Sequence, residues 1–231
     1  MVAANELKVI VGGSLAALFG ELGPQFEKAS GHKLLIHFDS TPNIISRINA
    51  DTPFDAVLVP VDVFKDATAK SHFVPTSIGD IARVGFGVIV RAGAPKPDIS
   101  TSEAFKAALL KASSVASTPS SAGGAYIAKV YERLGIADAI KAKTQAFAAP
   151  NAIAPAVARG DAELGIFVMN VFNAPGIELA GPFPADLQQD LVFTCAIAAD
   201  TKEQDAAKAF IDYLKTPAAT AAIKAAGMTP G

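Results

Sequence analysis

The chain has 231 residues, 51% of them hydrophobic and 18% charged, which is typical of a folded globular protein and excludes a disordered chain. Twenty Lys and Arg against 22 Asp and Glu give a net charge of −2, so there is no basic excess to bind nucleic acid. The lone Cys195 excludes an intrachain disulfide, and His32, His37 and His72 lie too far apart for a HExxH-type metal site. We therefore expect no metal and no cofactor.

The sequence gives no sign of direct insertion into a membrane. Its most apolar stretch, residues 164–184, is interrupted by Asn, Pro and Gly before it reaches the roughly 20 residues of a membrane helix. The opening residues, MVAANELKV, contain neither the basic nor the apolar segment of a signal peptide. Two expectations follow: a cytoplasmic protein if the chain is full length, or an exported protein whose leader is absent.

The first third of the chain alternates short apolar runs with amphipathic segments, which predicts an α/β fold with mostly parallel strands. Strands are predicted over residues 7–11, 33–38 and 55–59. An apolar stripe from Leu15 to Phe26 predicts a helix with Ser14 as its N-cap. Thr41-Pro42 has the pattern of an N-cap followed by an N1 proline, and a further helix is predicted over residues 63–70.

The rest of the chain continues the alternation of strands and helices. Strands are predicted over residues 85–90, 114–117, 145–148, 164–168 and 190–197, and helices over 102–111, 124–134 and 152–159. Thr201 to Gln204 has a capping-box pattern that predicts the start of a helix running to Leu214. A second Thr-Pro pair, Thr216-Pro217, predicts the last helix, which Gly227 ends.

No Gly/Ser linker divides the chain, so two lobes would have to be joined through strands, near residues 81–87 and 191–193. This predicts a discontinuous first lobe, residues 1–82 with 193–231, and a second lobe, residues 83–192. Both termini would then lie in the first lobe. Such a layout is typical of hinged, clamp-like binding proteins.

Glycine and hydroxyl residues gather where predicted strands lead into predicted helices. The residues concerned are Gly13 and Ser14, Ser40 and Thr41, Gly123 and Gly124, Asn151, and Asn170. Helix N-termini offer N–H donors to anions, and ligands of open α/β sheets bind at the carboxyl ends of the strands. The alternative interpretation of each junction is ordinary helix capping.

Catalytic residues are harder to identify. Asp39, Asp55 and Asp62 lie at strand edges, where capping explains them equally well. His37 and Tyr126 are possible bases, and each has an equally good structural interpretation. We therefore predict no catalytic residue.

Several segments together resemble a known family across nearly the whole chain. They are strand–Gly13-Ser14-Leu15, residues 38–41 followed by 48–55, residues 122–126 before a helix ending Leu134-Gly135, residues 164–166, and residues 213–219. These segments are similar to those of the substrate-binding proteins of ABC importers, in the molybdate-binding branch. The resemblance implies a type II periplasmic binding protein fold: two lobes, each a mixed, mostly parallel sheet flanked by helices, with a ligand cleft between them.

The resemblance also implies how the site is built. In that family, neutral hydroxyls and backbone N–H groups hold an oxyanion, and the matching positions here are Ser14, Thr41 with Ser40 beside it, Gly123, and the Pro150-Asn151 turn. Two positions depart from the pattern. Pro150 has no N–H, and Val168 stands where the family has a tyrosine hydroxyl. We therefore expect a carboxylate or other oxyanion rather than molybdate.

The resulting prediction is a monomeric, periplasmic solute-binding protein that delivers a small anion to an ABC permease. The alternative is an enzyme on the same two-lobed fold, because some members of this fold group isomerise small tricarboxylates such as aconitate. That reaction needs one positioned base and several carboxylate-binding donors. His37 and Tyr126 are the residues that the sequence offers as the base.

Overall fold

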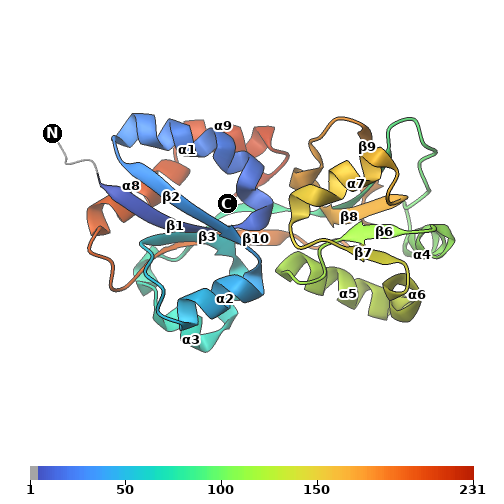
Figure 1. Ribbon diagram of the computed structural model, residues 1–231, viewed down its shortest axis with the longest axis horizontal. Coiled ribbons are helices and arrows are strands. Elements are labelled where there is room, and N and C mark those ends of the chain that lie inside the picture. The colour runs from blue at the N-terminus through green and yellow to red at the C-terminus, as the bar shows by residue number, and fades with distance from the viewer. Residues whose placement is uncertain (1–4) are drawn as a thin grey trace. The chain divides into compact units, whose positions relative to one another are not determined.

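The computed structural model describes residues 5–231 and divides the chain into two compact units (Figure 1). Unit 1 comprises Met1–Arg83 and Val192–Gly231, and unit 2 comprises Val84–Leu191. The chain therefore passes between the units twice, within the strands β4 (Gly79–Val84) and β10 (Leu191–Ile197).

Unit 1 is built on a six-stranded sheet in the order β11-β4-β10-β3-β1-β2. Its other strands are β1 (Glu6–Gly12), β2 (Lys33–Asp39), β3 (Ala56–Pro60) and β11 (Thr229–Pro230). Its helices are α1 (Ala16–Ser30), α2 (Thr41–Asn49), α3 (Ala67–Ser71), α8 (Gln204–Leu214) and α9 (Pro217–Ala225). β1 pairs in parallel with both β2 and β3, whereas β10 runs antiparallel to β3.

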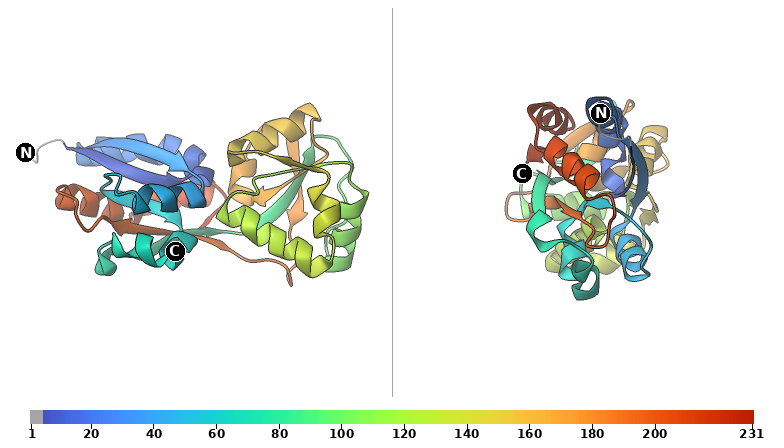
Figure 2. Two further views of the ribbon diagram at one scale, coloured as in Figure 1. Left: turned by 60° about the horizontal axis from the view of Figure 1, so that its bottom comes forward. Right: turned by 90° about the vertical axis from the view of Figure 1, so that its left-hand side faces the viewer.

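Helices cover both faces of the unit 1 sheet, which explains why all five residues of β3 are buried. α1, α8 and α9 lie on one face, where the rings of Phe26 and Phe210 meet edge-on with centroids 5.4 Å apart (Figures 1 and 2). α2 and α3 lie on the other face, where Ile44 and Ile48 pack with Val57 in a buried cluster. The apolar stripe predicted for the first helix is confirmed, because its members are all buried in α1 or in the turn before it.

Unit 2 is built on a five-stranded mixed sheet in the order β7-β6-β8-β5-β9. The strands are β5 (Phe86–Arg91), β6 (Val115–Ser117), β7 (Thr144–Ala146), β8 (Leu164–Val168) and β9 (Ile177–Pro182). The helices are α4 (Ser102–Lys111), α5 (Ala122–Leu134), α6 (Ala137–Lys141) and α7 (Ile153–Arg159). α5 and α7 lie on opposite faces of this sheet (Figure 1).

Aromatic side chains fill the space between the unit 2 sheet and the helices α4 and α5. Phe86 of β5 packs on Tyr126 of α5 and on Phe183, with centroid distances of 5.0 and 5.6 Å. Phe183 in turn packs on Phe105 of α4 at 4.9 Å. Apolar contacts of this kind make up the core of the unit.

Several predicted elements differ from the structure. The helix predicted over residues 63–70 is two pieces, a 3-10 turn over Val61–Lys65 and then α3, because Asp66 between them is extended. The Asp66 carboxylate instead accepts the Ala69 N–H at 2.8 Å and caps α3. The capping box predicted at Thr201 is also wrong, because the N-cap of α8 is Glu203 and the Thr201 hydroxyl instead accepts the Glu203 N–H at 3.0 Å, one turn ahead of the helix.

Three strands or α-helices were not predicted at all, namely β9, α6 and the two-residue strand β11. β9 is half-exposed, and its pairing with β5 shifts register between Val88 and Ile89, which interrupts the alternation by which strands are identified in sequence. α6 has only five residues, too few for an apolar period to appear.

Candidate functional site

In unit 1, two of the predicted ligand-binding segments lie side by side. β1 and β2 are parallel neighbours, and Gly12 at the end of β1 pairs with Asp39 at the end of β2. Gly13 and Ser14 follow the first strand, and Ser40 and Thr41 follow the second. The two segments therefore emerge at the same edge of the sheet, the carboxyl ends of its parallel strands.

The Gly13–Ser14 segment is a 3-10 turn, Gly13–Leu15, which precedes α1. The prediction that Ser14 caps the helix is wrong, because the N-cap of α1 is Leu15 and neither it nor Gly12 makes a side-chain cap. A Cβ at Gly12 would lie 3.0 Å from the Pro60 side chain, so glycine fits best where β1 passes the end of β3. The extra turn moves Ser14 away from the helix start and along the edge of the sheet.

The Ser40–Thr41 segment begins α2. Ser40 occupies the N-cap position without a side-chain cap, so the prediction that Thr41 is the N-cap is wrong. The Asp39 carboxylate accepts the Ser40 backbone N–H at 2.8 Å and an N–H of the Asn43 side-chain amide at 2.7 Å. Among the described residues, neither the Ser40 nor the Thr41 hydroxyl has a hydrogen-bond partner.

Asp39 also makes the only histidine contact near this edge within residues 5–231. His37 Nε2 lies 3.2 Å from Asp39 Oδ2. Partial burial acts to raise the pKa of Asp39, but hydrogen bonds from Asn43, Ser40 and His37 outweigh it and hold the pKa below its ordinary value. Because an ionised carboxylate can only accept, His37 Nε2 is the donor of this hydrogen bond.

In unit 2, the remaining predicted residues follow three parallel strands. β6 pairs with β7, Ser117 opposite Ala146, and with β8, Ala116 opposite Gly165. The segments that follow these strands, residues 118–121, 147–152 and 169–172, therefore all emerge at one edge of this sheet.

At the start of α5, the two glycines have different roles. The Gly124 N–H donates to Ser121 Oγ at 3.0 Å, and Ser121 Oγ donates to the Thr118 carbonyl at 2.8 Å. The Gly124 N–H is therefore already committed to the cap, contrary to the expectation that both glycines donate to a ligand. The Gly123 N–H has no acceptor among the described residues.

The two asparagines lie in 3-10 turns. Asn151 is exposed within Pro150–Ala152, and it does not cap α7, whose N-cap is Ala152. Asn170 is buried within Met169–Phe172, directly after the fully buried Val168. Sequence reasoning missed Thr118, which is fully buried and whose hydroxyl has no partner among residues 5–231. The sequence did contain a signal for Thr118, because it lies in a loop rich in hydroxyl residues.

The other candidates for catalysis have structural roles. The buried Asp55 accepts the Lys8 N–H at 2.7 Å and the Thr201 hydroxyl at 2.5 Å. The Tyr126 hydroxyl donates to the Leu187 carbonyl at 2.6 Å, so it is not available as a base. Cys195 is buried, and that burial raises the pKa of its thiol, which makes it unreactive.

Within residues 5–231 no three His, Cys, Asp or Glu side chains are grouped to hold a metal ion. No helix in the same range has the length and apolarity needed to cross a bilayer.

Comparison with known proteins supports one family. Its sequence profile, described as "Bacterial extracellular solute-binding protein", matches residues 7–229. An aconitate isomerase from a Pseudomonas species is 32% identical over 98% of this chain and 88% of that protein. The molybdate-binding protein ModA of Azotobacter vinelandii is 30% identical over 97% of this chain and 90% of that protein.

Solved structures agree at the level of the fold. The periplasmic molybdate-binding protein of Azotobacter vinelandii superposes with a TM-score of 0.79 at 22% identity, covering 96% of this chain and 98% of that one. The predicted type II periplasmic binding protein fold and the resemblance to the molybdate-binding branch are thereby confirmed.

Proposed function

Because the chain belongs to the family of bacterial extracellular solute-binding proteins, we propose that it binds a small carboxylate anion rather than molybdate. The proposal includes delivery of this anion to an ABC permease in the periplasm. The single observation that carries the choice of ligand is the shortage of hydrogen-bond donors at the helix starts. Fewer donors are available there than the sequence suggested.

Four groups that would donate to a compact oxyanion are absent or already bonded. The Ser40 N–H is taken by Asp39, and the Gly124 N–H is taken by Ser121. Pro150 has no N–H, and Val168 has no hydroxyl. A tetrahedral dianion held by neutral groups needs a dense shell of short hydrogen bonds, because each of its oxygens loses water on binding.

The donors that remain are few. Unit 1 offers the Ser40 and Thr41 hydroxyls, and unit 2 offers the Gly123 N–H at the start of α5. A ligand with two or three carboxylates presents its charge at separate points, each of which needs only a few donors. The same donors suit a carboxylate better than a single compact anion.

A thermal-shift panel tests this proposal. A ligand that binds only the folded state at 100 times its Kd stabilises the protein by about 2.7 kcal/mol. We expect citrate, trans-aconitate or a related carboxylate to raise the melting temperature, and molybdate, tungstate and sulfate to leave it unchanged. A rise with molybdate alone would contradict the proposal.

A second function, isomerisation of a tricarboxylate, is favoured by the His37–Asp39 pair and by the aconitate isomerase relative. Moving the double bond of aconitate requires a base to take a proton from a CH2 group and return it at the other end of the three-carbon unit. His37 contacts Asp39 through Nε2, and Asp39 immediately precedes Ser40 and Thr41. The pair therefore stands next to donors that are able to hold a carboxylate.

Proton NMR of cis- and trans-aconitate incubated with the protein distinguishes the two functions. Turnover that is lost in His37→Gln while binding remains would assign an isomerase with His37 as its base. Binding without any interconversion in the unmodified protein would leave transport as the function. Turnover that survives in His37→Gln would remove His37 from the mechanism.

A further inference from the structure

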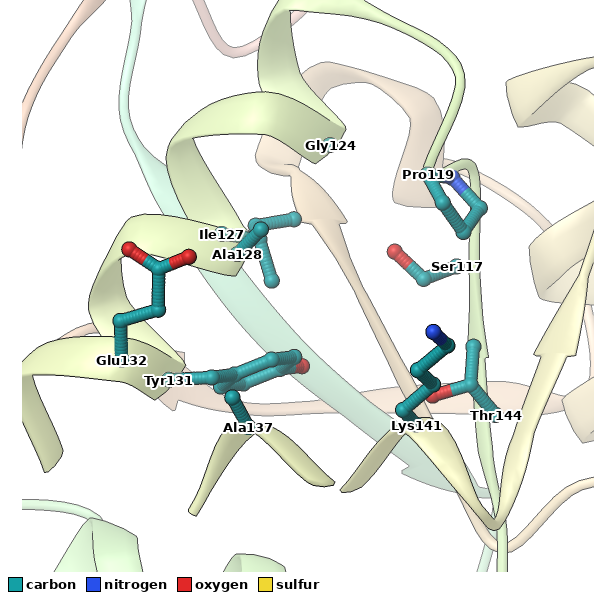
Figure 3. Close-up of a pocket in the computed structure, with 10 residues that line it drawn as sticks. All are labelled: Ser117, Pro119, Gly124, Ile127, Ala128, Tyr131, Glu132, Ala137, Lys141 and Thr144. Carbon is teal, nitrogen blue, oxygen red and sulfur yellow. The ribbon is translucent and has the colours of Figure 1, made fainter. Parts of the chain in front are cut away.

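Unit 2 has a pocket that includes only one of the predicted ligand-binding residues, Gly124, whose N–H is already bonded to Ser121 Oγ. It has a volume of about 310 Å³, the lower end of the range for small-molecule sites, and it lies between α5, α6 and the strands β6 and β7 (Figure 3). Its walls are mainly apolar and include Pro119, Ile127, Ala128 and Ala137. A pocket with such walls favours an apolar body over an inorganic ion.

A buried hydroxyl faces this apolar space. Tyr131 lines the pocket, and its hydroxyl points towards the interior in Figure 3. The hydroxyl oxygen is buried and has no hydrogen-bond partner among the described residues. Burying a hydroxyl without a partner costs about 1–3 kcal/mol, so its presence needs an explanation. Burial also raises the pKa of Tyr131 well above its ordinary value, so the group is a neutral O–H donor.

Two further donors accompany Tyr131. Ser117, at the end of β6, is 4% exposed, and its hydroxyl has no partner among residues 5–231. Lys141, at the end of α6, makes no ion pair in that range, and its ammonium lies on the same side of the pocket as Ser117 in Figure 3. Glu132 lies on the opposite side, away from the ammonium.

We propose that this pocket binds a small organic acid with an apolar body, such as an aromatic or medium-chain monocarboxylate. The Lys141 ammonium pairs with the carboxylate, and the Ser117 and Tyr131 hydroxyls donate hydrogen bonds to its oxygens. The ring or chain packs on Ile127, Ala128 and Ala137. This site is separate from the proposed function, because none of these residues is among the donors assigned to it.

Titration of the full chain with benzoate, followed by proton–nitrogen NMR, tests the proposal. We expect saturable binding of one benzoate per chain, with shifts concentrated in α5 and α6, and much weaker binding of benzamide and acetate. Tyr131→Phe and Lys141→Gln should each weaken benzoate binding about 10- to 100-fold, which is the loss of one hydrogen bond to a charged group.

Two control variants separate the site from folding and from the proposed function. Tyr126→Phe, on the same helix, removes a hydroxyl that is bonded to Leu187 outside the pocket, so it should lower the melting temperature and leave benzoate binding unchanged. Ser14→Ala should also leave benzoate binding unchanged. Absence of saturable binding up to the solubility limit, equal binding of benzamide, or shifts located at Ser14 and Ser40 would each overturn the proposal.

Discussion

Replacing Gly124 by Ala is expected to destabilise unit 2 far more than replacing Gly123, although the two are adjacent in one helix. A Cβ at Gly124 would lie 2.1 Å from the Thr118 carbonyl oxygen and 2.5 Å from that of Pro119, and both are backbone atoms. The start of α5 must therefore shift, and the bond from Gly124 to Ser121 Oγ is lost with it. Overpacking of about 1–3 kcal/mol and a lost cap of about 1 kcal/mol give about 2–4 kcal/mol.

Gly123→Ala is the matched control. Its Cβ would lie 3.0 Å from the ring of Phe167, a side chain that is able to move, so we expect a loss at the lower end of the range, about 1 kcal/mol. Urea unfolding of both variants, followed by fluorescence of tyrosines in unit 2, gives the comparison. Equal free energies of unfolding for the two variants would refute the assignment of Gly124 as a structural glycine and Gly123 as a ligand donor.

Four further predictions follow from individual contacts. Ser14→Ala should weaken binding of the carboxylate about 10- to 100-fold in a calorimetric titration, which is the loss of one hydrogen bond to a charged ligand. Asp55→Ala should cost about 2–5 kcal/mol in urea unfolding, since it leaves the Lys8 N–H and the Thr201 hydroxyl without their acceptor. Asp39 has a lowered pKa, so its contribution to stability is present above the ordinary carboxyl pKa of about 4 and is lost as the pH falls. In Asp39→Asn, the free energy of unfolding should therefore fall less steeply between about pH 7 and pH 3 than in the unmodified protein. Tyr131 has a raised pKa, so the contribution of its neutral hydroxyl to stability is fully present below about pH 10 and is lost at higher pH. In Tyr131→Phe, the free energy of unfolding should therefore fall less steeply above about pH 10.

The elements with strong apolar periodicity were predictable from the sequence. The stripe from Leu15 to Phe26 appears as α1, and the near-continuous apolar run at residues 55–59 appears as the buried β3. In both cases many consecutive turns or strand positions pack against the core, so apolar residues recur at a regular spacing. A local departure from regular structure does not hide such a pattern.

The details of the site were not predictable, because they depend on the conformation of single residues. Ser14 and Thr41 both have the pattern of an N-cap, yet Ser14 lies in a 3-10 turn and the N-cap of α2 is Ser40. Likewise nothing in the sequence distinguishes Gly123 from Gly124. Only the distance from Gly124 N to Ser121 Oγ, 3.0 Å, shows which amide is committed.

The central claim is that the ligand carries its charge on carboxylates. Isothermal titration of the full chain with trans-aconitate and, separately, with molybdate tests it most directly. The account predicts saturable binding of the tricarboxylate, weakened in Ser14→Ala, and no measurable heat from molybdate. Submicromolar binding of molybdate, with no binding of the tricarboxylate, would contradict it.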